Sequence, residues 1–410
     1  MIDRRTVLSA SLAAAGTILA GRASAQARPL RLGVLTDLSG PYRDTGGLTA
    51  VACVQQAAQD FAAATGTAPA EVIVADHQNK TDLGISLARE WFDRGGVDAI
   101  VEVNQSAIAF AVNDLVREKD KVHLNTGAGS SDLTGKNCSP NMTHWQSDTY
   151  SRAHGTAAAV LQTGSDKWYF VTADYAFGHS IRDETAKLVR ASGGKVMGDS
   201  TYPFPSTTDF SAFLLAAQAS GANVIALCNT AGDFINGVKQ AQEFRLAANG
   251  VRVVGMVSFI GDIHALGLSA AQGLLVAEPF YWDMNERTRA FTSRVVPRTP
   301  QNYPNSEHAC NYAATLHYLK CAAAVGADRA KASGRAVVDA MKRTPTDDDC
   351  FGRNTIREDG RVMFPMHLFE VKKPEDSSRP WDYYRLRASA PADQAFRPLA
   401  EGGCSFLRKG

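Results

Sequence analysis

Short apolar runs alternate with longer stretches of helical spacing along the first 260 residues. Apolar and β-branched runs of four to eight residues predict buried strands, and the amphipathic stretches between them predict helices. The first set has predicted strands at 30–36, 71–76, 99–103 and 122–125, with helices at about 49–65, 81–94 and 107–118. Strands that alternate with helices are typical of a parallel sheet covered on both faces.

The pattern restarts after a break near residues 143–148. The second set has predicted helices at about 150–162, 178–191, 210–220 and 233–244, with strands at 167–172, 195–202, 224–227 and 252–257. The last third adds strands at 273–277 and 366–372, helices at about 306–325 and 333–342, and a hairpin over 355–364. The two sets of strands and helices predict two α/β lobes, each with a doubly wound sheet. The late return of α/β material predicts a chain that crosses between the lobes more than once, which makes a hinge.

The first 25 residues have the layout of an export signal. Arg4 and Arg5 precede an apolar stretch at 7–20, and Ala23-Ser24-Ala25 provides a small-residue cleavage site. At about 14 residues the apolar stretch is too short for a permanent membrane anchor. The paired arginines fit a twin-arginine signal and an ordinary secretory signal equally. We therefore expect export by one of these routes, with roughly 385 residues left for the folded protein.

Charge and cysteine content narrow the classes of partner. The sequence has 43 basic and 42 acidic residues, and this balance disfavours nucleic acid as a partner. Seven cysteines in an exported chain allow disulfides but leave at least one thiol free. Cys138, Cys350 and Cys404 lie in polar, loop-like sequence, and a bridge between Cys138 and Cys404 is the first choice. The other four cysteines lie in apolar patterns and are expected to be packed.

The sequence lacks the common catalytic motifs. GxSxG, HExxH and GxGxxG are absent, and no His/Cys spacing matches a zinc site. Gly129 and Gly135-Lys136-Asn137 look like a phosphate loop, but the gap is one residue too long and Asn replaces the Ser/Thr that binds magnesium. We therefore expect a binding protein with no cofactor and no metal.

Small polar residues follow several predicted strands. These loops are at 104–106, 125–131, 173–178 and 228–233. Each can be explained as a helix cap, but carboxyl ends of parallel strands meet at one edge, where open α/β sheets bind ligands. Aromatic residues in or beside such loops include Tyr42, Trp145, Tyr175, Phe177, Phe259 and Tyr281. The combination predicts a cleft that holds an apolar or planar solute.

Six segments together resemble the type I periplasmic substrate-binding proteins of ABC importers, the group that includes the leucine/isoleucine/valine-binding protein. The segments are 33–42 (GVLTDLSGPY), 96–101 (GVDAIV), 132–135 (DLTG), 173–178 (ADYAFG), 207–213 (TTDFSAF) and 356–361 (IREDGR). The resemblance implies two Rossmann-like lobes joined by three crossovers, which close on a small solute in the periplasm. It also implies a monomer that docks on an inner-membrane permease. The expected parts are lobe 1 at 26–146 plus 276–349, lobe 2 at 147–275 plus 350–385, and a tail at 386–410.

Carried over by position, Ser106 and the loop from Gly127 to Ser130 match the pocket for a ligand carboxylate in amino-acid binders. Phe177 and Val257 stand where those proteins use a Tyr and a Glu for the α-ammonium, which leaves Asp233 as a substitute anion. A buried ammonium without a partner is costly, so the exchange favours an aromatic or other apolar carboxylate over an α-amino acid. Amides, urea, atypical amino acids and a periplasmic sensor role remain alternatives. The expected ligand-binding residues are Tyr42, Gln105, Ser106, Thr126, Gly127, Ala128, Gly129, Ser130, Trp145, Tyr175, Phe177, Thr230, Asp233, Val257, Phe259 and Tyr281.

Overall fold

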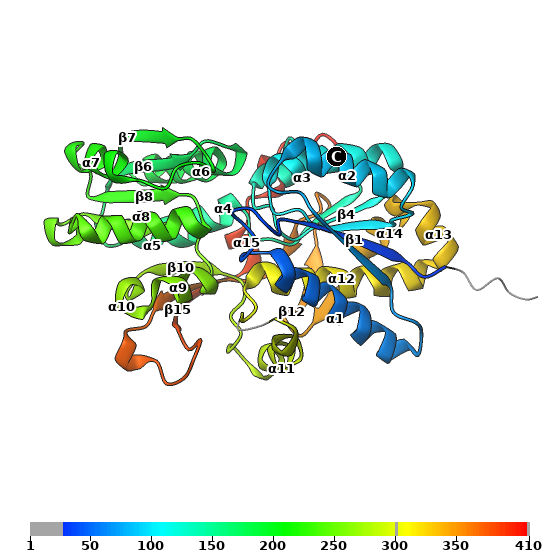
Figure 1. Ribbon diagram of the computed structural model, residues 1–410. Helices are drawn as coiled ribbons and strands as arrows, with labels where there is room; N and C mark the ends of the chain where they lie inside the picture. Colours follow the sequence, from blue (N-terminus) through cyan, green and yellow to red (C-terminus); the bar gives the residue numbers. More distant parts are fainter. Residues whose placement is uncertain (1–27, 300–301, 408–410) are drawn as a thin grey trace, which may run out of the picture.

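Two lobes lie side by side in the computed structural model, which describes residues 28–299 and 302–407 (Figure 1). The expected export signal lies outside the described residues. The first lobe is built on a parallel five-stranded sheet with the order β2-β1-β3-β4-β5. Its strands are β1 (Arg31–Thr36), β2 (Glu71–Asp76), β3 (Ala99–Glu102), β4 (Val122–Asn125) and β5 (Met142–His144).

Helices cover both faces of this sheet because alternate strand residues point to opposite sides. Leu32 and Val34 face a core with α1, α12 and α14, whereas Leu35 and Ile100 face a core with α2 and α3. The helices are α1 (Gly47–Thr65), α2 (Thr81–Asp93), α3 (Ser106–Lys119), α12 (Ser306–Val325), α13 (Ala327–Ala332) and α14 (Gly334–Arg343). The sheet is thus buried on both faces except at its edge strand β2.

The second lobe repeats this plan with a parallel four-stranded sheet of order β7-β6-β8-β9. Its strands are β6 (Lys167–Ala173), β7 (Lys195–Tyr202), β8 (Val224–Cys228) and β9 (Arg252–Gly255). Trp168 and Phe170 pack under α6, while Tyr169 and Val171 pack under α7 and α8. The helices are α4 (Thr149–Arg152), α5 (Ala158–Leu161), α6 (Ala176–Ala191), α7 (Ser211–Ala219), α8 (Ala231–Glu243), α9 (Ile260–Leu266) and α10 (Leu268–Ala271). A π-helical turn at Ala153–Ala157 joins α4 to α5, where the sequence predicts one helix.

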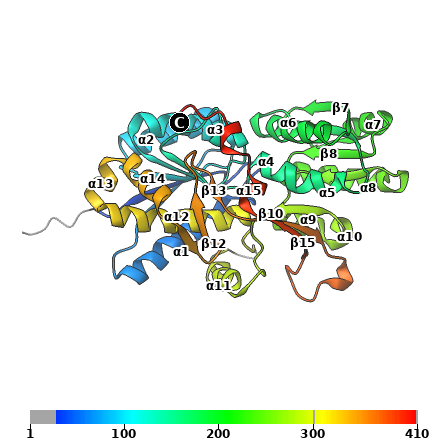
Figure 2. The same ribbon diagram turned by 180° about the vertical axis from the view of Figure 1, so that it is seen from behind.

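The last third of the chain returns to both lobes. It forms α11 (Glu286–Val295), β10 (Leu275–Glu278), β11 (Thr346–Asp348), β12 (Gly352–Ile356), β13 (Val362–Met363), β14 (Met366–Val371), β15 (Tyr384–Ala390) and α15 (Ala392–Ala395). The antiparallel sheet β10-β14-β15 shares a core with β8, whereas β12, β13 and α15 pack against the first lobe. The chain therefore crosses near residues 145–148, 279–305 and 364–366, and the tail crosses back at α15 (Figure 2).

This packing favours lobe boundaries that differ from the expected ones. Val276 of β10, expected in lobe 1, packs with the second lobe, and Ile356 and Val362, expected in lobe 2, pack with the first. The reason is local: the Gly360 carbonyl accepts a hydrogen bond from the His144 amide at 2.8 Å, so the β12–β13 hairpin lies beside the edge strand β5. We propose that β10, β14 and β15 belong to lobe 2 and that β11 to β13 belong to lobe 1. The expected tail from residue 386 also contains most of β15.

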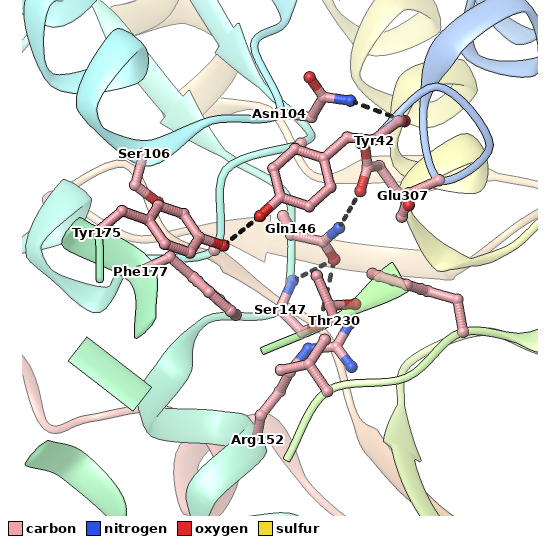
Figure 3. Close-up of a pocket in the computed structure, with 15 residues that line it drawn as sticks. Tyr42, Asn104, Ser106, Gln146, Ser147, Arg152, Tyr175, Phe177, Thr230 and Glu307 are labelled. Atoms are coloured by element: carbon pink, nitrogen blue, oxygen red, sulfur yellow. Dashed lines mark hydrogen bonds between the residues drawn. The ribbon is translucent and has the colours of Figure 1, made fainter. Parts of the chain in front are cut away.

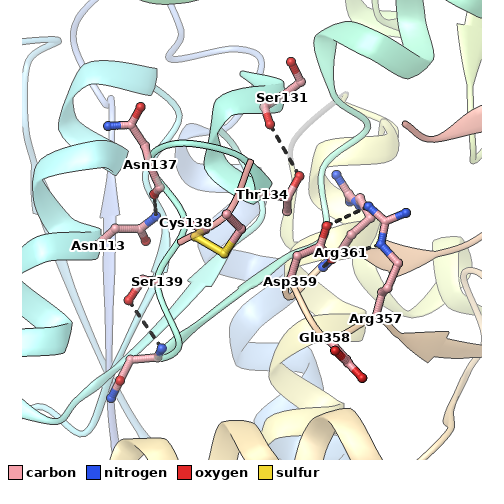
Figure 4. Close-up of a disulfide and its surroundings, with 12 residues drawn as sticks. Asn113, Ser131, Thr134, Asn137, Cys138, Ser139, Arg357, Glu358, Asp359 and Arg361 are labelled. Atoms are coloured by element: carbon pink, nitrogen blue, oxygen red, sulfur yellow. Dashed lines mark hydrogen bonds and ion pairs between the residues drawn. A yellow bond between two sulfur atoms is a disulfide. The ribbon is translucent and has the colours of Figure 1, made fainter. Parts of the chain in front are cut away.

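A disulfide between Cys138 and Cys404 ties the tail to the first lobe (Figure 4). It joins positions 266 residues apart, with a Cα–Cα distance of 5.7 Å. This is the bridge that the sequence favours. The remaining cysteines are free and buried, and they include Cys350, which the sequence places in a loop. Within the described ranges, no helix is both long and apolar enough to cross a membrane.

Candidate functional site

The carboxyl ends of both parallel sheets face a small cavity between the lobes, with a volume of about 40 Å³ (Figure 3). The first lobe contributes loops after β1, β3 and β4 and the start of α12. The second lobe contributes α4 and the loops after β6, β8 and β9. The lining residues are Tyr42, Thr45, Asn104, Ser106, Gly127, Gly129, Gln146, Ser147, Arg152, Tyr175, Phe177, Thr230, Val257, Phe259 and Glu307.

Two hydroxyl groups lie at the cavity without protein partners. Ser106 is the first residue of α3, and the side chain of Gln105 caps this helix by accepting a hydrogen bond from the Ile108 amide at 2.8 Å. The hydroxyl of Ser106 and that of Thr230, which precedes α8, are buried with no hydrogen-bond partner in the described structure. A buried hydroxyl without a partner is costly, so each is suited to bind a polar ligand atom.

Glycine at 127 and 129 keeps the backbone of the β4 loop next to the cavity. A Cβ on Gly127 would lie 2.7 Å from Asn104 Cα and 2.9 Å from Asn104 N, both backbone atoms. A Cβ on Gly129 would lie 3.1 Å from the Phe177 ring, which is a side chain that can turn. The first glycine is therefore required by close backbone approach, and the second is required less strictly.

Gly127→Ala is expected to lower the free energy of unfolding by about 1–3 kcal/mol, because two backbone segments must separate. Gly129→Ala is the matched control, and we expect it to cost less than about 1 kcal/mol. Urea unfolding of both variants checks the difference. Equal losses for the two variants would contradict the proposed close approach of residues 104 and 127.

Aromatic side chains from both lobes form the apolar wall. Tyr42 extends from the first lobe, and its hydroxyl hydrogen-bonds to the hydroxyl of Tyr175 from the second lobe (Figure 3). Phe204 stacks on Tyr175 with 4.5 Å between ring centroids, and Phe177 and Phe259 complete the wall. The hydrogen bond between Tyr42 and Tyr175 joins the lobes directly, so opening the cleft must break it.

Arg152 is a buried cation in the wall of the cavity. It ends α4, is 2% exposed, and its guanidinium carbon lies 4.9 Å from the centroid of the Phe259 ring. Its Nη1 donates to the Ala277 carbonyl at 3.2 Å, and its Nη2 lies 3.5 Å from Glu278 Oε1. A guanidinium has five N–H donors, so these contacts leave donors for a ligand anion.

Two carboxyl groups near Arg152 titrate at unusually high pH. Burial raises the pKa of Glu278 to about 8, which outweighs the opposing effect of Arg152, and burial raises the pKa of Asp262 to about 7. A folded pKa above the unfolded value stabilises the fold at low pH, and this contribution is lost as pH rises through the folded pKa. Burial also lowers the pKa of His123 and of His308 to about 3. These histidines give the opposite slope, but only below about pH 6.5.

The free energy of unfolding is therefore expected to fall between pH 7 and pH 8. Glu278 supplies most of this slope, up to about 1.4 kcal/mol per pH unit, because the contribution of Asp262 has largely ended above pH 7. Glu278→Gln should flatten it, and Glu90→Gln, a change at an exposed residue of α2, should not. Urea unfolding at several pH values measures both. Stability that is constant across this range would contradict the raised pKa values.

A pair of carboxyl groups meets at the first-lobe side of the cavity. Glu102 ends β3 and Glu307 lies in the first turn of α12; the first accepts a hydrogen bond from Asn311 and the second from Gln146. The Oε1 atom of each has no partner within the described residues, and a Cβ on Gly46 would lie 2.1 Å from one and 2.8 Å from the other. Burial, and then the charge of Glu102, raise the pKa of Glu307 well above its usual value; burial also raises that of Glu102.

Nine of the sixteen residues expected from the sequence line the cavity, and seven do not. The side chain of Gln105 caps α3. Four others make polar contacts elsewhere. Thr126 contacts Glu102 and Asn311, and Ser130 caps the 3₁₀ turn after β4. Asp233 accepts a hydrogen bond from Tyr202, and Tyr281 donates to the Trp381 carbonyl. Ala128 and Trp145 are packed in the first-lobe cores.

The sequence reasoning missed six lining residues, among them both charged ones. Arg152 and Glu307 lie at helix ends, outside the strand-end loops on which the expectation concentrated. A signal for Glu307 was present: it begins a long apolar helix in which Asn311 follows four residues later on the same face. Asp233, the substitute anion suggested by the sequence, does not reach the cavity, and Glu307 from the other lobe does.

Comparison with known proteins agrees with this architecture. A crystal structure of a periplasmic binding protein from Burkholderia mallei is 39% identical, with a TM-score of 0.86 over 92% of this chain and 99% of that one. One described as a branched chain amino acid ABC transporter periplasmic ligand-binding protein, from Burkholderia xenovorans, is 37% identical, with a TM-score of 0.79 over the same shares. A Leu/Ile/Val-binding protein homolog from Brucella melitensis is 24% identical over 99% of both chains.

The family model described as periplasmic binding protein matches residues 29–377, which include both sheets and every lining residue of the cavity. The chain belongs to this family of periplasmic binding proteins, in the type I group that resembles the leucine/isoleucine/valine-binding protein.

Proposed function

We propose that the protein is the periplasmic solute-binding component of an ABC importer. It captures a small carboxylate with an apolar or aromatic body, closes its lobes on it, and delivers it as a monomer to an inner-membrane permease. One observation carries this proposal: the cavity between the lobes combines a buried cation with an aromatic wall.

The polar groups of the cavity are suited to a carboxylate. Arg152 brings the positive charge, and Ser106 and Thr230 bring hydroxyls that have no other partner among the described residues. Charge-assisted hydrogen bonds of this kind are about twice as strong as neutral ones. Both lobes contribute, since Ser106 belongs to the first and Arg152 and Thr230 to the second. A bound carboxylate therefore favours the closed arrangement.

One side of the wall is suited to an apolar or planar body. Tyr42, Tyr175, Phe177, Val257 and Phe259 line the cavity. Phe177 and Val257 offer no polar atom to an ammonium group beside the carboxylate. The volume of about 40 Å³ is below the ~150 Å³ of a cavity that holds benzene. Binding of an aromatic acid therefore requires the lobes or the rings of Tyr42 and Tyr175 to move apart slightly.

A plain α-amino acid is the second candidate. The 37% identical protein from Burkholderia xenovorans is described as a branched chain amino acid transporter component, which favours this class. Val257→Glu combined with Phe177→Tyr separates the two candidates. The changes should weaken binding of an apolar carboxylate and should strengthen binding of L-leucine.

A thermal-shift screen of refolded, ligand-stripped protein tests the proposal. The probes are benzoate, phenylacetate, 4-methylpentanoate, L-leucine, benzamide and urea. A solute at 100 times its dissociation constant adds ~2.7 kcal/mol of stability. We expect the organic acids to stabilise the protein most. Stabilisation by benzamide or urea without any by the acids would contradict the proposed ligand class.

A further inference from the structure

The buried pair of Glu102 and Glu307 has an arrangement that the carboxylate site does not explain. Glu102 comes from β3 and Glu307 from α12, and Glu307 lines the cavity. Each has one oxygen, Oε1, that is buried and has no partner among the described residues, and the two oxygens approach the same point beside Gly46. Two carboxylates this close do not both ionise easily, so the pair holds a proton.

The backbone at Glu102 is also strained. Glu102 and Val103 have φ values of 81° and 62°, in the left-handed region that side chains other than glycine rarely adopt. Such strain persists only where surrounding contacts enforce it, and it gathers at ligand clamps. The strained segment leads directly into the loop with Asn104 and Ser106, both of which line the cavity.

Titratable groups from both lobes lie near the pair, among them His308 of α12, which stays neutral because burial lowers its pKa to about 3. Arg152 is the cation that faces Glu307, from the second-lobe side of the cavity. Cys53 of α1 and Cys310 of α12 are thiols near the pair, and burial raises the pKa of each, so they stay neutral. Hydrogen bonds come from neutral groups, namely Asn311 and Thr126 to Glu102 and Gln146 to Glu307. The pair therefore has no cation on its own side among the described residues.

Figure 3 shows Glu307 and Arg152 on opposite sides of the pocket. From this arrangement we propose that the solute carries a positively charged nitrogen group remote from its carboxylate, and that this group binds the Glu102–Glu307 pair and displaces its shared proton. The inference rests on the proposed function, which gives the solute its carboxylate, and it adds the chemical class of the group at the other end of the solute. Glu307 is the contact residue, and Glu102 is a positioning residue that holds the proton with it.

Binding of the ammonium group to the Glu102–Glu307 pair releases one proton. The ligand-free pair holds one proton; the incoming ammonium brings its own charge, and the shared proton leaves to solvent. Binding of such a cation should therefore release a proton and tighten as pH rises toward the titration of the pair. A solute without the nitrogen leaves the proton in place.

Two matched probes test this. The first is 4-(aminomethyl)benzoate, and the second is 4-ethylbenzoate, in which a methyl group replaces the ammonium. We expect the first to bind roughly 10- to 100-fold more tightly, as for a hydrogen bond to a charged group. Glu307→Gln should remove most of this preference while changing the affinity for 4-ethylbenzoate less than about threefold. Glu90→Gln is the control and should change neither.

Calorimetry of the wild-type protein in two buffers of different ionisation enthalpy measures proton release, and it decides the question if Glu307→Gln does not fold. Release on binding 4-(aminomethyl)benzoate supports the inference, and its absence overturns it. A preference for L-leucine over 4-methylpentanoate that Glu307→Gln removes would place the nitrogen beside the carboxylate, and it would overturn the inference of a remote nitrogen. Binding of 4-ethylbenzoate with no binding of any ammonium-bearing probe overturns the inference and leaves the proposed function intact. Binding of benzylamine with no binding of any carboxylate overturns the proposed carboxylate ligand and leaves the contact between Glu307 and a charged nitrogen intact.

Discussion

Replacing Arg152 with methionine is expected to weaken carboxylate binding by roughly 100-fold or more, because the cavity loses its buried cation. The same change removes the partner of Glu278, whose oxygen lies 3.5 Å from the guanidinium. The free energy of unfolding should fall by roughly 3 kcal/mol at pH 8.5, where Glu278 must either lose its proton without a counter-charge or keep it at a cost. At pH 6 the loss should be smaller, because the isolated acid stays protonated.

The double variant Arg152→Met with Glu278→Gln separates the two roles of the arginine. It should recover most of the stability at pH 8.5 but none of the affinity. Arg152→Lys keeps the charge without the planar fork and should give intermediate affinity. The measurements are urea unfolding at both pH values and calorimetric titration with the acid that stabilises most in the thermal screen. Wild-type affinity in the double variant would contradict a role for Arg152 in binding.

Removing the disulfide is expected to have the second large effect. Cys138→Ser with Cys404→Ser should lower the free energy of unfolding by about 2–5 kcal/mol, because the bridge closes a very long loop in the unfolded chain. Urea unfolding measures this loss. A change below about 0.5 kcal/mol would show that the tail is held without the bridge.

The disulfide also holds Arg397 at the junction of the lobes. Arg397 donates to the Ser131 carbonyl at 2.8 Å in the first lobe and lies 3.6 Å from Glu184 in the second. Hydrogen exchange in residues 392–407 should therefore rise in the reduced variant, while the cavity keeps its lining and its affinity within about threefold. Arg397→Ala is the matched control, since it removes these contacts and keeps the covalent link.

The architecture could be predicted from the sequence because strand and helix periodicity is a local property. β1, β2 and β6 were predicted within one residue of their bounds. The last third was harder, since its strands pair over long range. β10 pairs with β14, which lies about ninety residues later, and nothing local indicates which lobe receives them. The same limit applies to β12 and β13, whose place is set by contact with His144.

The candidate site could be predicted where backbone geometry sets it. Loops after parallel strands meet at one edge, which placed Tyr42, Ser106, Gly127, Tyr175 and Thr230 at the cavity. Neighbouring residues in the same loops point elsewhere, because Gln105 and Ser130 serve as helix caps. Side-chain direction within a loop is decided by capping and packing, which loop position alone does not reveal.

The charged residues could not be placed in the same way. Arg152 and Glu307 are 155 positions apart in the numbering and reach one cavity only because the lobes face each other there. A charged residue at a helix end is most often explained by the helix dipole or by solvent exposure. Their burial is what distinguishes them, and burial depends on the other lobe.

Closure of the two lobes on a carboxylate is the central claim, and the distance between the lobes tests it most directly. Leu48 in α1 and Lys239 in α8 are exposed, and the loop before α1 and the first turn of α8 line a groove between the lobes. Spin labels at Leu48→Cys and Lys239→Cys report the separation by pulsed electron resonance, and the native free cysteines are buried. We predict that the stabilising acid shortens the distance in the wild type and not in Arg152→Met. Saturating acid that leaves the distance unchanged in the wild type would contradict the account.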